Sequence, residues 1–273
     1  MNFLSVKNRH LAVITSMLLL LSSCAGNASE NSSRKVRGEN GYKSIDVEAF
    51  GEGTEIRSAG NILMENPGGL LEITMVDQAN DSVLVVAVHG YESQGYEWVT
   101  GLKNLVEHYG SVFFFRYDWK SCPDDIARDL VSDILKAKRE GGYKRVVIFG
   151  HSYGGVVVTF AASQLEKENA EIHIIAAPLS GFPKLLDNCE NMKYGDEDKL
   201  IYATWNASVK VIQYKTVHAQ DGAFRDLASD PQEINLPFYQ VEELPPTMDG
   251  HRLGHNWSVT WVLDKHIGKP HRY

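Results

Sequence analysis

The sequence lacks the patterns that mark several classes of protein. An apolar run near the N-terminus covers only residues 11–21, which is too short for a comfortable membrane span. No run of basic residues is present, and 35 acidic residues outnumber 27 basic ones, which argues against a nucleic-acid-binding protein. There is no internal repeat, no HExxH, no paired CxxC and no glycine-rich phosphate loop. We therefore expect neither a metal nor another cofactor.

The N-terminal segment has the features of an export signal. Basic residues precede the apolar run, which ends in Ser22-Ser23-Cys24. Small residues before a cysteine at this place resemble the bacterial lipoprotein signal, which implies cleavage after residue 23 and lipidation of Cys24. An ordinary signal peptide with an incidental cysteine is the alternative. Ala25 in the sorting position resembles an outer-membrane address if the host is Gram-negative, so we expect an exported protein anchored to the cell envelope.

Composition divides the rest of the chain in two. Residues 24–44 are polar and rich in Ser, Asn, Gly and charge, which predicts a flexible tether. Residues 45–273 fit one α/β domain. Removing Lys7 and Arg9 with the leader takes the 27 basic residues to 25 against 35 acidic ones. This acidic balance argues against broad binding to anionic lipid beyond the anchor itself.

Strand and helix signals alternate from about residue 70 onward, which predicts a parallel sheet covered by helices on both faces. A segment without clear periodicity, residues 179–208, is expected to form a small cap. The expected strands cover residues 70–75, 83–88, 112–115, 145–149, 172–177, 209–214 and 238–241, with a turn at 77–81. The expected helices cover residues 96–109, 124–139 and 155–165, and Trp257, Trp261 and Val262 indicate a closing helix.

One pentapeptide, Gly150-His151-Ser152-Tyr153-Gly154, lies between an expected strand and an expected helix. This is the context in which G-x-S-x-G forms a nucleophile elbow, a turn so tight that bulky side chains cannot flank the serine. We therefore expect a strained turn that presents the Ser152 hydroxyl to a base.

The motifs together resemble the α/β-hydrolase family from about residue 70 to the C-terminus. Besides the pentapeptide, His89-Gly90-Tyr91 follows an apolar strand, and FRYDWK at 115–120 resembles the YDWR stretch of some lipases and lipid acyltransferases. The resemblance implies an oxyanion hole made by backbone N–H groups. Either Gly90 or Tyr91 supplies one donor, with Tyr91 preferred, and Tyr153 supplies the other. His89 is expected to anchor the loop by hydrogen bonds.

The resemblance also implies a serine, acid and histidine triad in that chain order. Four histidines follow the penultimate strand and precede or enter the final helix region, and the loop after the last strand leaves His251 and His255 as candidate bases. We select His255, because it lies where the final helix should begin and Gly254 leaves room for the imidazole. His266 is expected on the closing helix and solvated.

The acid should follow the penultimate strand. Asp221 is the first carboxylate there, in what the sequence predicts to be an exposed turn. The alternatives that stay open, because the acid can come from other loops, are Asp226, Asp230, Asp187 and Asp249.

The residues around this site predict its function. His151, Tyr117 and Trp119 are candidate substrate-binding residues. An apolar, aromatic mouth is predicted by five residues: Tyr91, Tyr96, Tyr117, Trp119 and Tyr153. We expect a serine hydrolase, esterase-like or lipase-like, that cleaves a small-molecule or lipid carboxylic ester through an acyl-enzyme. The alternatives are a thioesterase, acyltransferase or peptidase on the same triad, or a non-catalytic envelope binding protein. The sequence predicts no oligomeric state.

Two cysteines remain after lipidation of Cys24. Cys122 and Cys189 both lie in loops expected at one edge of the sheet, and an exported compartment permits a disulfide. We predict a bridge that ties the cap down. Two free, buried cysteines are the alternative.

Overall fold

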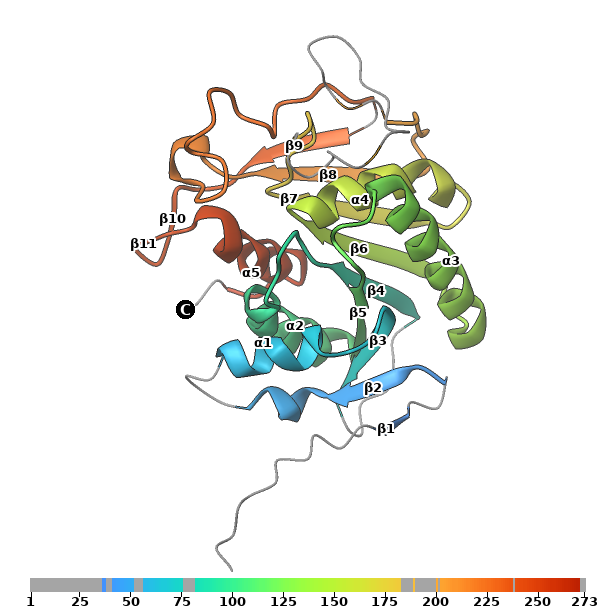
Figure 1. The fold of residues 1–273 in the computed structure, drawn as a ribbon. Helices are drawn as coiled ribbons and strands as arrows, with labels where there is room; N and C mark the ends of the chain where they lie inside the picture. The colour runs from blue at the N-terminus through green and yellow to red at the C-terminus, as the bar shows by residue number, and fades with distance from the viewer. Residues whose placement is uncertain are drawn as a thin grey trace, which may run out of the picture. The chain divides into compact units, whose positions relative to one another are not determined.

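A nine-stranded sheet is the central element of the fold (Figure 1). The computed structural model describes residues 36–37, 41–51, 56–75, 82–182, 189, 200, 202–237 and 239–270. The strands lie in the order β1-β2-β3-β5-β4-β6-β7-β8-β9, and all neighbours are parallel except β1–β2 and β3–β5. Their bounds are β1 Val36–Arg37, β2 Lys43–Asp46, β3 Gly69–Thr74, β4 Val83–Val88, β5 Ser111–Arg116, β6 Arg145–His151, β7 Ala170–Ile175, β8 Lys210–Lys215 and β9 Tyr239–Glu243. A separate antiparallel pair joins β10 Thr247–Met248 to β11 His251–Arg252.

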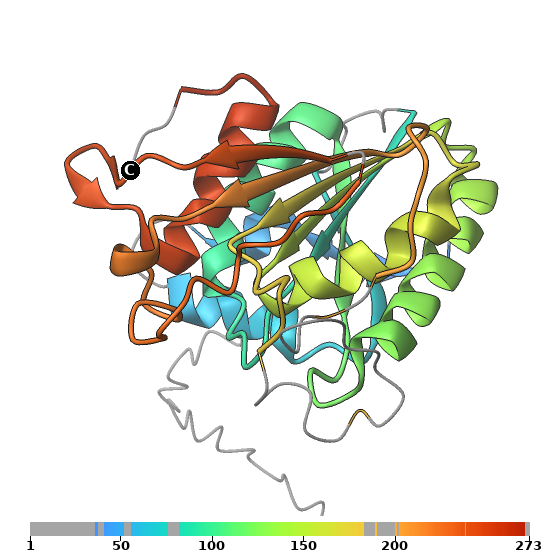
Figure 2. The ribbon, with the colours of Figure 1, turned by 90° about the horizontal axis from the view of Figure 1, so that it is seen from above.

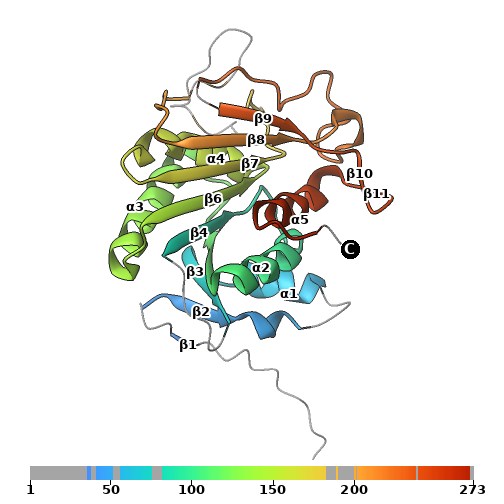
Figure 3. The ribbon, with the colours of Figure 1, turned by 180° about the vertical axis from the view of Figure 1, so that it is seen from behind.

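Helices cover both faces of this sheet, as Figures 2 and 3 show from above and from behind. Helices α3 (Pro123–Gly141) and α4 (Tyr153–Ala161) pack on one face. Helices α1 (Ile56–Met64), α2 (Tyr96–Tyr109) and α5 (Gly254–His266) pack on the other. Short 3-10 helices occur at η1 Val47–Phe50, η2 Ala162–Leu165 and η5 His218–Gln220. The expected α/β architecture with a mostly parallel sheet is confirmed.

The sequence explains why the central strand lies where it does. Strand β4 is an uninterrupted apolar run, and its residues alternate between the two cores: Val86 packs with α3 and α4, whereas Val85 packs with α2 and α5. Helix α3 buries Ile126 and Leu130 at a spacing of four, and it ends at Gly142 in a left-handed conformation with φ of 68°. These periodicities fix which faces meet the sheet.

Two boundaries differ from the sequence predictions. The sheet begins inside the expected tether, because β1 and Lys43 and Ser44 of β2 pair with neighbouring strands, and Ile45 is buried beyond them. Helix α5 begins at Gly254, so His255 lies in its first turn rather than before it. Residues 1–35, the expected turn at 77–81 and most of the expected cap lie outside the described residues. The described residues belong to one compact unit, Ser33–Tyr273.

No helix among the described residues is both long enough and apolar enough to cross a bilayer.

Candidate active site

Ser152 lies in the turn between β6 and α4 with φ of 54° and ψ of −120°. A positive φ is uncommon for a residue with a side chain and is held only where the surroundings enforce it. Here the Ser152 N–H donates to Ile175 O at 2.9 Å, which fixes the turn against the end of β7. The side-chain hydroxyl makes no hydrogen bond to any described residue. Catalytic hydrogen bonds are often loose before substrate binds.

The flanking glycines are required by space. A Cβ on Gly150 would lie 2.5 Å from Gly154 O, and a Cβ on Gly154 would lie 2.3 Å from Val88 O. The loop after β4 approaches closely as well, since a Cβ on Gly90 would lie 3.0 Å from Ser152 Cβ. The sequence G-x-S-x-G therefore brings the serine turn and the His89-Gly90-Tyr91 loop into contact.

His89 anchors the loop after β4 by hydrogen bonds within the interior. Its ring is fully buried, it stacks on the Tyr117 ring at 4.2 Å, and Nδ1 lies 2.8 Å from Gly90 O. The Tyr117 N–H donates to Nε2 at 3.4 Å, so the contacts suit a neutral ring with its proton on Nδ1. Burial lowers the pKa of His89 to about 3, which keeps the ring neutral.

Asp221 and His255 form a hydrogen-bonded pair at the same edge of the sheet. Asp221 is fully buried after η5, and its Oδ2 accepts from His255 Nδ1 at 2.9 Å. The Thr216 hydroxyl also donates to Oδ2, and the Ala223 N–H donates to Oδ1 at 2.8 Å. Burial by itself raises the pKa of Asp221, but His255 and these donors outweigh it and lower the pKa. The turn itself is largely exposed, as expected, but the Asp221 side chain points into the interior.

The other candidate bases and acids lie apart from this pair. His251 is exposed on β11, and His266, expected to be solvated, instead packs at the end of α5 with its Nε2 2.9 Å from Tyr109 OH. Burial lowers the pKa of His266 to about 4. The Asp226 side chain is 90% exposed, and Asp249 lies in the β10–β11 turn. Asp230 accepts from the Gln232 N–H at 3.0 Å and from the Gln232 side-chain amide at 3.1 Å, and Asp187 lies outside the described residues.

A cavity of about 130 Å³ adjoins Ser152. His151 and His255 line it, together with the loop after β4 and the first turn of α2: Gly90, Tyr91, Glu92, Ser93, Gln94, Tyr96 and Glu97. His151 is buried, and its Nε2 lies 3.1 Å from His255 O, which ties the start of α5 to the serine turn. Polar groups dominate this wall, so the expected apolar, aromatic mouth is wrong for the described residues.

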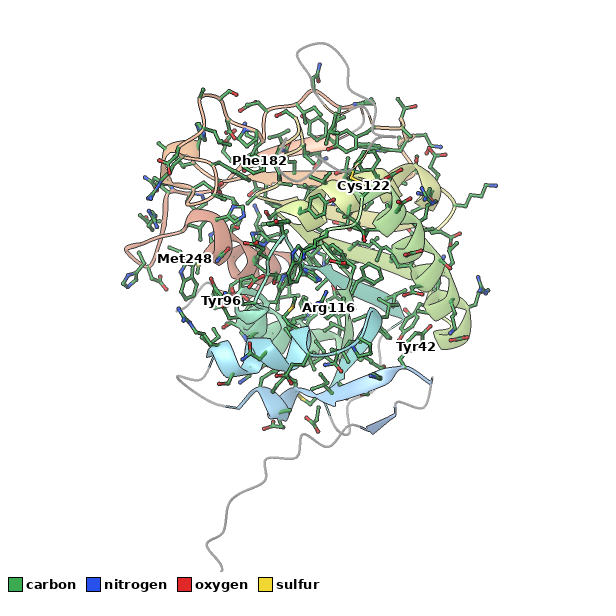
Figure 4. The ribbon with its side chains drawn as sticks, in the orientation of Figure 1. Tyr42, Tyr96, Arg116, Cys122, Phe182 and Met248 are labelled. Carbon is green, nitrogen blue, oxygen red and sulfur yellow. A yellow bond between two sulfur atoms is a disulfide. The ribbon has the colours of Figure 1, made fainter. Side chains whose placement is uncertain are left out.

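Two of the three expected substrate-binding residues do not line this cavity. Tyr117 is buried and its hydroxyl donates to His89 O, so it supports the loop after β4. Trp119 is half-buried, and its ring centroid lies 6.5 Å from that of Tyr91. The Arg116 guanidinium lies 5.3 Å from the centroid of the Trp119 ring. Of the five expected aromatic residues, Tyr91 and Tyr96 line the cavity. Figure 4 labels Tyr96 and Arg116 and shows that they come from separate elements.

A disulfide joins Cys122, which precedes α3, to Cys189, with the Cα atoms 5.5 Å apart. The neighbouring Ser121 accepts a hydrogen bond from Tyr153 OH at 2.8 Å, so the bridge connects to the residue that follows Ser152. Cys122 is labelled in Figure 4, at the upper end of α3. The bridge therefore ties part of the expected cap to the edge of the sheet that carries Ser152.

Several residues around Ser152 and the Asp221–His255 pair were not predicted from the sequence. Thr216 and Gln232 form a buried network beneath Asp221, in which the Thr216 N–H donates to Gln232 Oε1 at 3.0 Å. Glu97 is buried on the cavity wall, where it accepts from the Ser93 hydroxyl. Asn256 donates to Tyr96 OH at 2.8 Å. Only Thr216 had a usable signal, its place directly after β8.

Comparison with solved structures finds distant likenesses. Est1E from Butyrivibrio proteoclasticus is 12% identical and matches 73% of this chain and 91% of its own, with a TM-score of 0.49. A serine hydrolase without a lid from Xanthomonas campestris is 16% identical over 77% of this chain and 94% of its own, with a TM-score of 0.44. With TM-scores below 0.5, neither carries an argument about function. No curated protein matches the sequence.

The match of the sequence to a family model is stronger evidence than these structural likenesses. The model of the alpha/beta hydrolase family matches residues 85–257, which span the loop after β4, the Ser152 turn, Asp221 and His255. This match covers more than half of the chain, and the sheet order and the serine turn agree with it. The chain belongs to the alpha/beta hydrolase family.

Proposed function

We propose that this protein is a serine hydrolase that cleaves carboxylic esters through an acyl-enzyme. The observation that carries the proposal is the buried Asp221–His255 hydrogen bond, whose histidine shares a cavity with Ser152 in its strained turn. A serine hydroxyl is a weak nucleophile until a base removes its proton, and an acid must orient that base.

Each residue has one role in the proposed reaction. His255 Nε2 takes the Ser152 proton as Oγ bonds to the ester carbon, and Asp221 stabilises the imidazolium. The ester C–O bond then breaks, and His255 gives the proton to the leaving alcohol oxygen. Water then attacks the acyl carbon as His255 takes its proton. The bond from the acyl carbon to Ser152 Oγ breaks, the acid leaves, and His255 gives the proton back to Oγ.

Two backbone N–H groups are proposed to hold the oxyanion, from Tyr91 and Tyr153. The Gly90 carbonyl is engaged by His89 Nδ1, and no described peptide is cis. In a trans peptide the N–H points opposite to the carbonyl, so the Tyr91 N–H is directed away from the His89 ring. This supports Tyr91 over Gly90, with His89 as the positioning residue.

The small, polar cavity at Ser152 favours a short acyl group over a long fatty chain. An ester also needs less help from the general acid than an amide does, because its leaving group is the weaker base. We therefore propose an esterase rather than a lipase or a peptidase.

Hydrolysis of p-nitrophenyl acetate tests the proposal. Ser152→Ala should lower kcat/KM by about 10⁴-fold or more, because triad members act as a unit. Circular dichroism would show that the fold is kept. A variant that keeps a tenth of the wild-type rate would contradict the assignment.

We further propose that the chain is exported and anchored to the envelope by lipid on Cys24, a residue outside the described part of the chain. Multiple acyl chains hold a protein firmly on a membrane, whereas one holds it marginally. Cys24→Ser should shift the protein from the membrane fraction to the soluble fraction, or leave it unprocessed. Normal processing with unchanged membrane association would refute the anchor without touching the catalytic proposal.

A further inference from the structure

A second, larger cavity adjoins the Ser152 cavity. It has a volume of about 590 Å³, within the range of small-molecule sites. Its walls come from α1, the start of α2, β11 and the start of α5. Both cavities are lined by the same four side chains, Tyr96, Glu97, His255 and Asn256. Tyr96, labelled in Figure 4, therefore lies on the boundary between them.

Two arginines from distant parts of the chain line this larger cavity. Arg57 comes from α1 and Arg252 from β11. Neither makes a hydrogen bond or ion pair with any other described residue, whereas Arg145, on another element, pairs with Glu171. The whole chain has a formal net charge of −8, so two unpaired guanidinium groups at one cavity form a local positive field.

The remaining wall favours an anion with an apolar body. Trp257 is 47% exposed and supplies an aromatic surface. The one carboxyl group on the wall belongs to Glu97, which is buried and accepts from Ser93. Burial raises the pKa of Glu97, which reduces the negative charge that would oppose an anion.

We propose that this cavity binds the alcohol portion of the ester, and that the natural alcohol carries a carboxylate or phosphate on a flat, apolar body. The inference rests on the proposed function. His255 must deliver its proton to the leaving oxygen, so the alcohol lies against His255, whereas the carbonyl lies at Ser152 and the Gly90–Tyr91 loop. From His255 the larger cavity leads to Arg57 and Arg252, whose guanidinium groups suit either anion.

A matched pair of acetate esters tests the subsite. The anionic ester is 3-acetoxybenzoate and the neutral one is 3-acetoxybenzamide. In the Arg57→Gln, Arg252→Gln double variant we expect the ratio of their kcat/KM values to fall about tenfold from that of the wild type. The wild-type ratio should also fall as salt is added, because salt screens exposed charges.

Arg139→Gln is the control, since it removes the same charge from an exposed position on α3. Its ratio should equal that of the wild type. An unchanged ratio in the double variant would overturn the subsite, as would an equal fall in the Arg139→Gln control.

A binding measurement separates this inference from the proposed function. In the Ser152→Ala protein, calorimetry should show that 3-hydroxybenzoate and phenyl phosphate bind about tenfold more tightly than 3-hydroxybenzamide, and that the double variant loses the difference. The stronger of the two anions identifies carboxylate or phosphate as the preferred group. Equal affinity for the neutral and anionic ligands would overturn the subsite even if ester hydrolysis is found. Selective anion binding without hydrolysis would overturn only the proposed function.

Discussion

The sheet carries an acid–histidine pair at each of its two edges. At the carboxyl edge, His255 Nδ1 donates to the buried Asp221. The other pair starts from the amino edge, where Glu171 is the second residue of β7 and its Oε1 lies 3.2 Å from Nε2 of His173, further along the strand. Both histidines are largely buried. Each pair joins a carboxylate to an imidazole, so we look for the difference in chemistry in what surrounds each pair.

The surroundings differ in charge and in neighbours. Glu171 also meets Arg145 and, at 2.9 Å, Lys210, so cations compensate it. The contact with His173 and the charge of Lys210 lower the pKa of Glu171, and burial lowers that of His173. Among the described residues, the Asp221 carboxylate accepts from His255, the Thr216 hydroxyl and the Ala223 N–H, and no lysine or arginine pairs with it. The first pair is a structural ion-pair cluster, whereas the second leaves His255 beside Ser152 and two cavities.

Parallel strands explain this division. The carboxyl ends of β4, β6 and β8 lead into loops at one edge, where ligands of open α/β sheets bind. The amino ends bring Arg145, Glu171 and Lys210 together at the other. An acid and a histidine in contact therefore indicate catalysis only at the edge where a nucleophile can join them.

The largest expected effect separates the two histidines. His255→Gln should lower kcat/KM for p-nitrophenyl acetate by about 10⁴-fold or more, because the base is lost. His173→Gln should leave kcat/KM within about twofold, since His173 lines neither of the two cavities beside His255. Steady-state kinetics on protein matched by circular dichroism measures both. Similar losses in the two variants would abolish the distinction between the edges.

The two acids should differ next. Asp221→Asn should lower kcat/KM on the order of 10³-fold, since the amide no longer holds the imidazole in the right tautomer. Glu171→Gln should instead leave kcat/KM unchanged and lower the free energy of unfolding by about 2 kcal/mol, because Arg145 and Lys210 lose a buried partner. Urea denaturation measures the free energy of unfolding, and steady-state kinetics on the same samples measures kcat/KM. Full activity in Asp221→Asn would move the acid to another carboxylate.

Much of this contrast was accessible from sequence, but not all of it. The run of β4 and the glycines around Ser152 have strict local signals, so the strand and the turn could be predicted. The burial of Asp221 could not, because it depends on Thr216 and Gln232 arriving from separate segments. The paired Glu171 and His173 also have no local signal, since Lys210 joins them only through strand pairing. Contacts that link distant segments decide which wall a side chain lines, and Tyr117 was misplaced for that reason.

The disulfide gives the carboxyl edge a covalent constraint. It closes a loop with a sequence separation of 67, which by the chain-entropy estimate stabilises the fold by about 4 kcal/mol. Reduction should therefore lower the melting temperature and loosen substrate selectivity. Thiol titration of the denatured, non-reduced Cys24→Ser protein should find no free thiol. Two thiols per chain would eliminate the bridge.

The smallest expected effect is a loss of folding stability at acidic pH, which arises from His89. Its pKa is about 3 in the fold and about 6.5 in the unfolded chain, so the unfolded state takes up the proton first as the pH falls. The stabilisation is complete above about pH 6.5 and is lost toward pH 3, with a loss of about 2 kcal/mol at pH 5.

His89→Asn tests this, since asparagine keeps a donor for Gly90 O and does not titrate. Urea denaturation at pH 7.5 and pH 5 should show a smaller acid loss in the variant than in the wild type. Equal losses would mean that His89 is not held neutral.

Covalent labelling with a fluorophosphonate, which reacts only with an activated serine, tests directly whether Ser152 is the nucleophile. Mass spectrometry of the digested protein should find one adduct, on Ser152, in the wild type and in His173→Gln. Ser152→Ala should carry no adduct, and His255→Gln should label orders of magnitude more slowly. An unlabelled wild-type protein, or an adduct on another serine, would contradict the assignment of the carboxyl edge as the catalytic one.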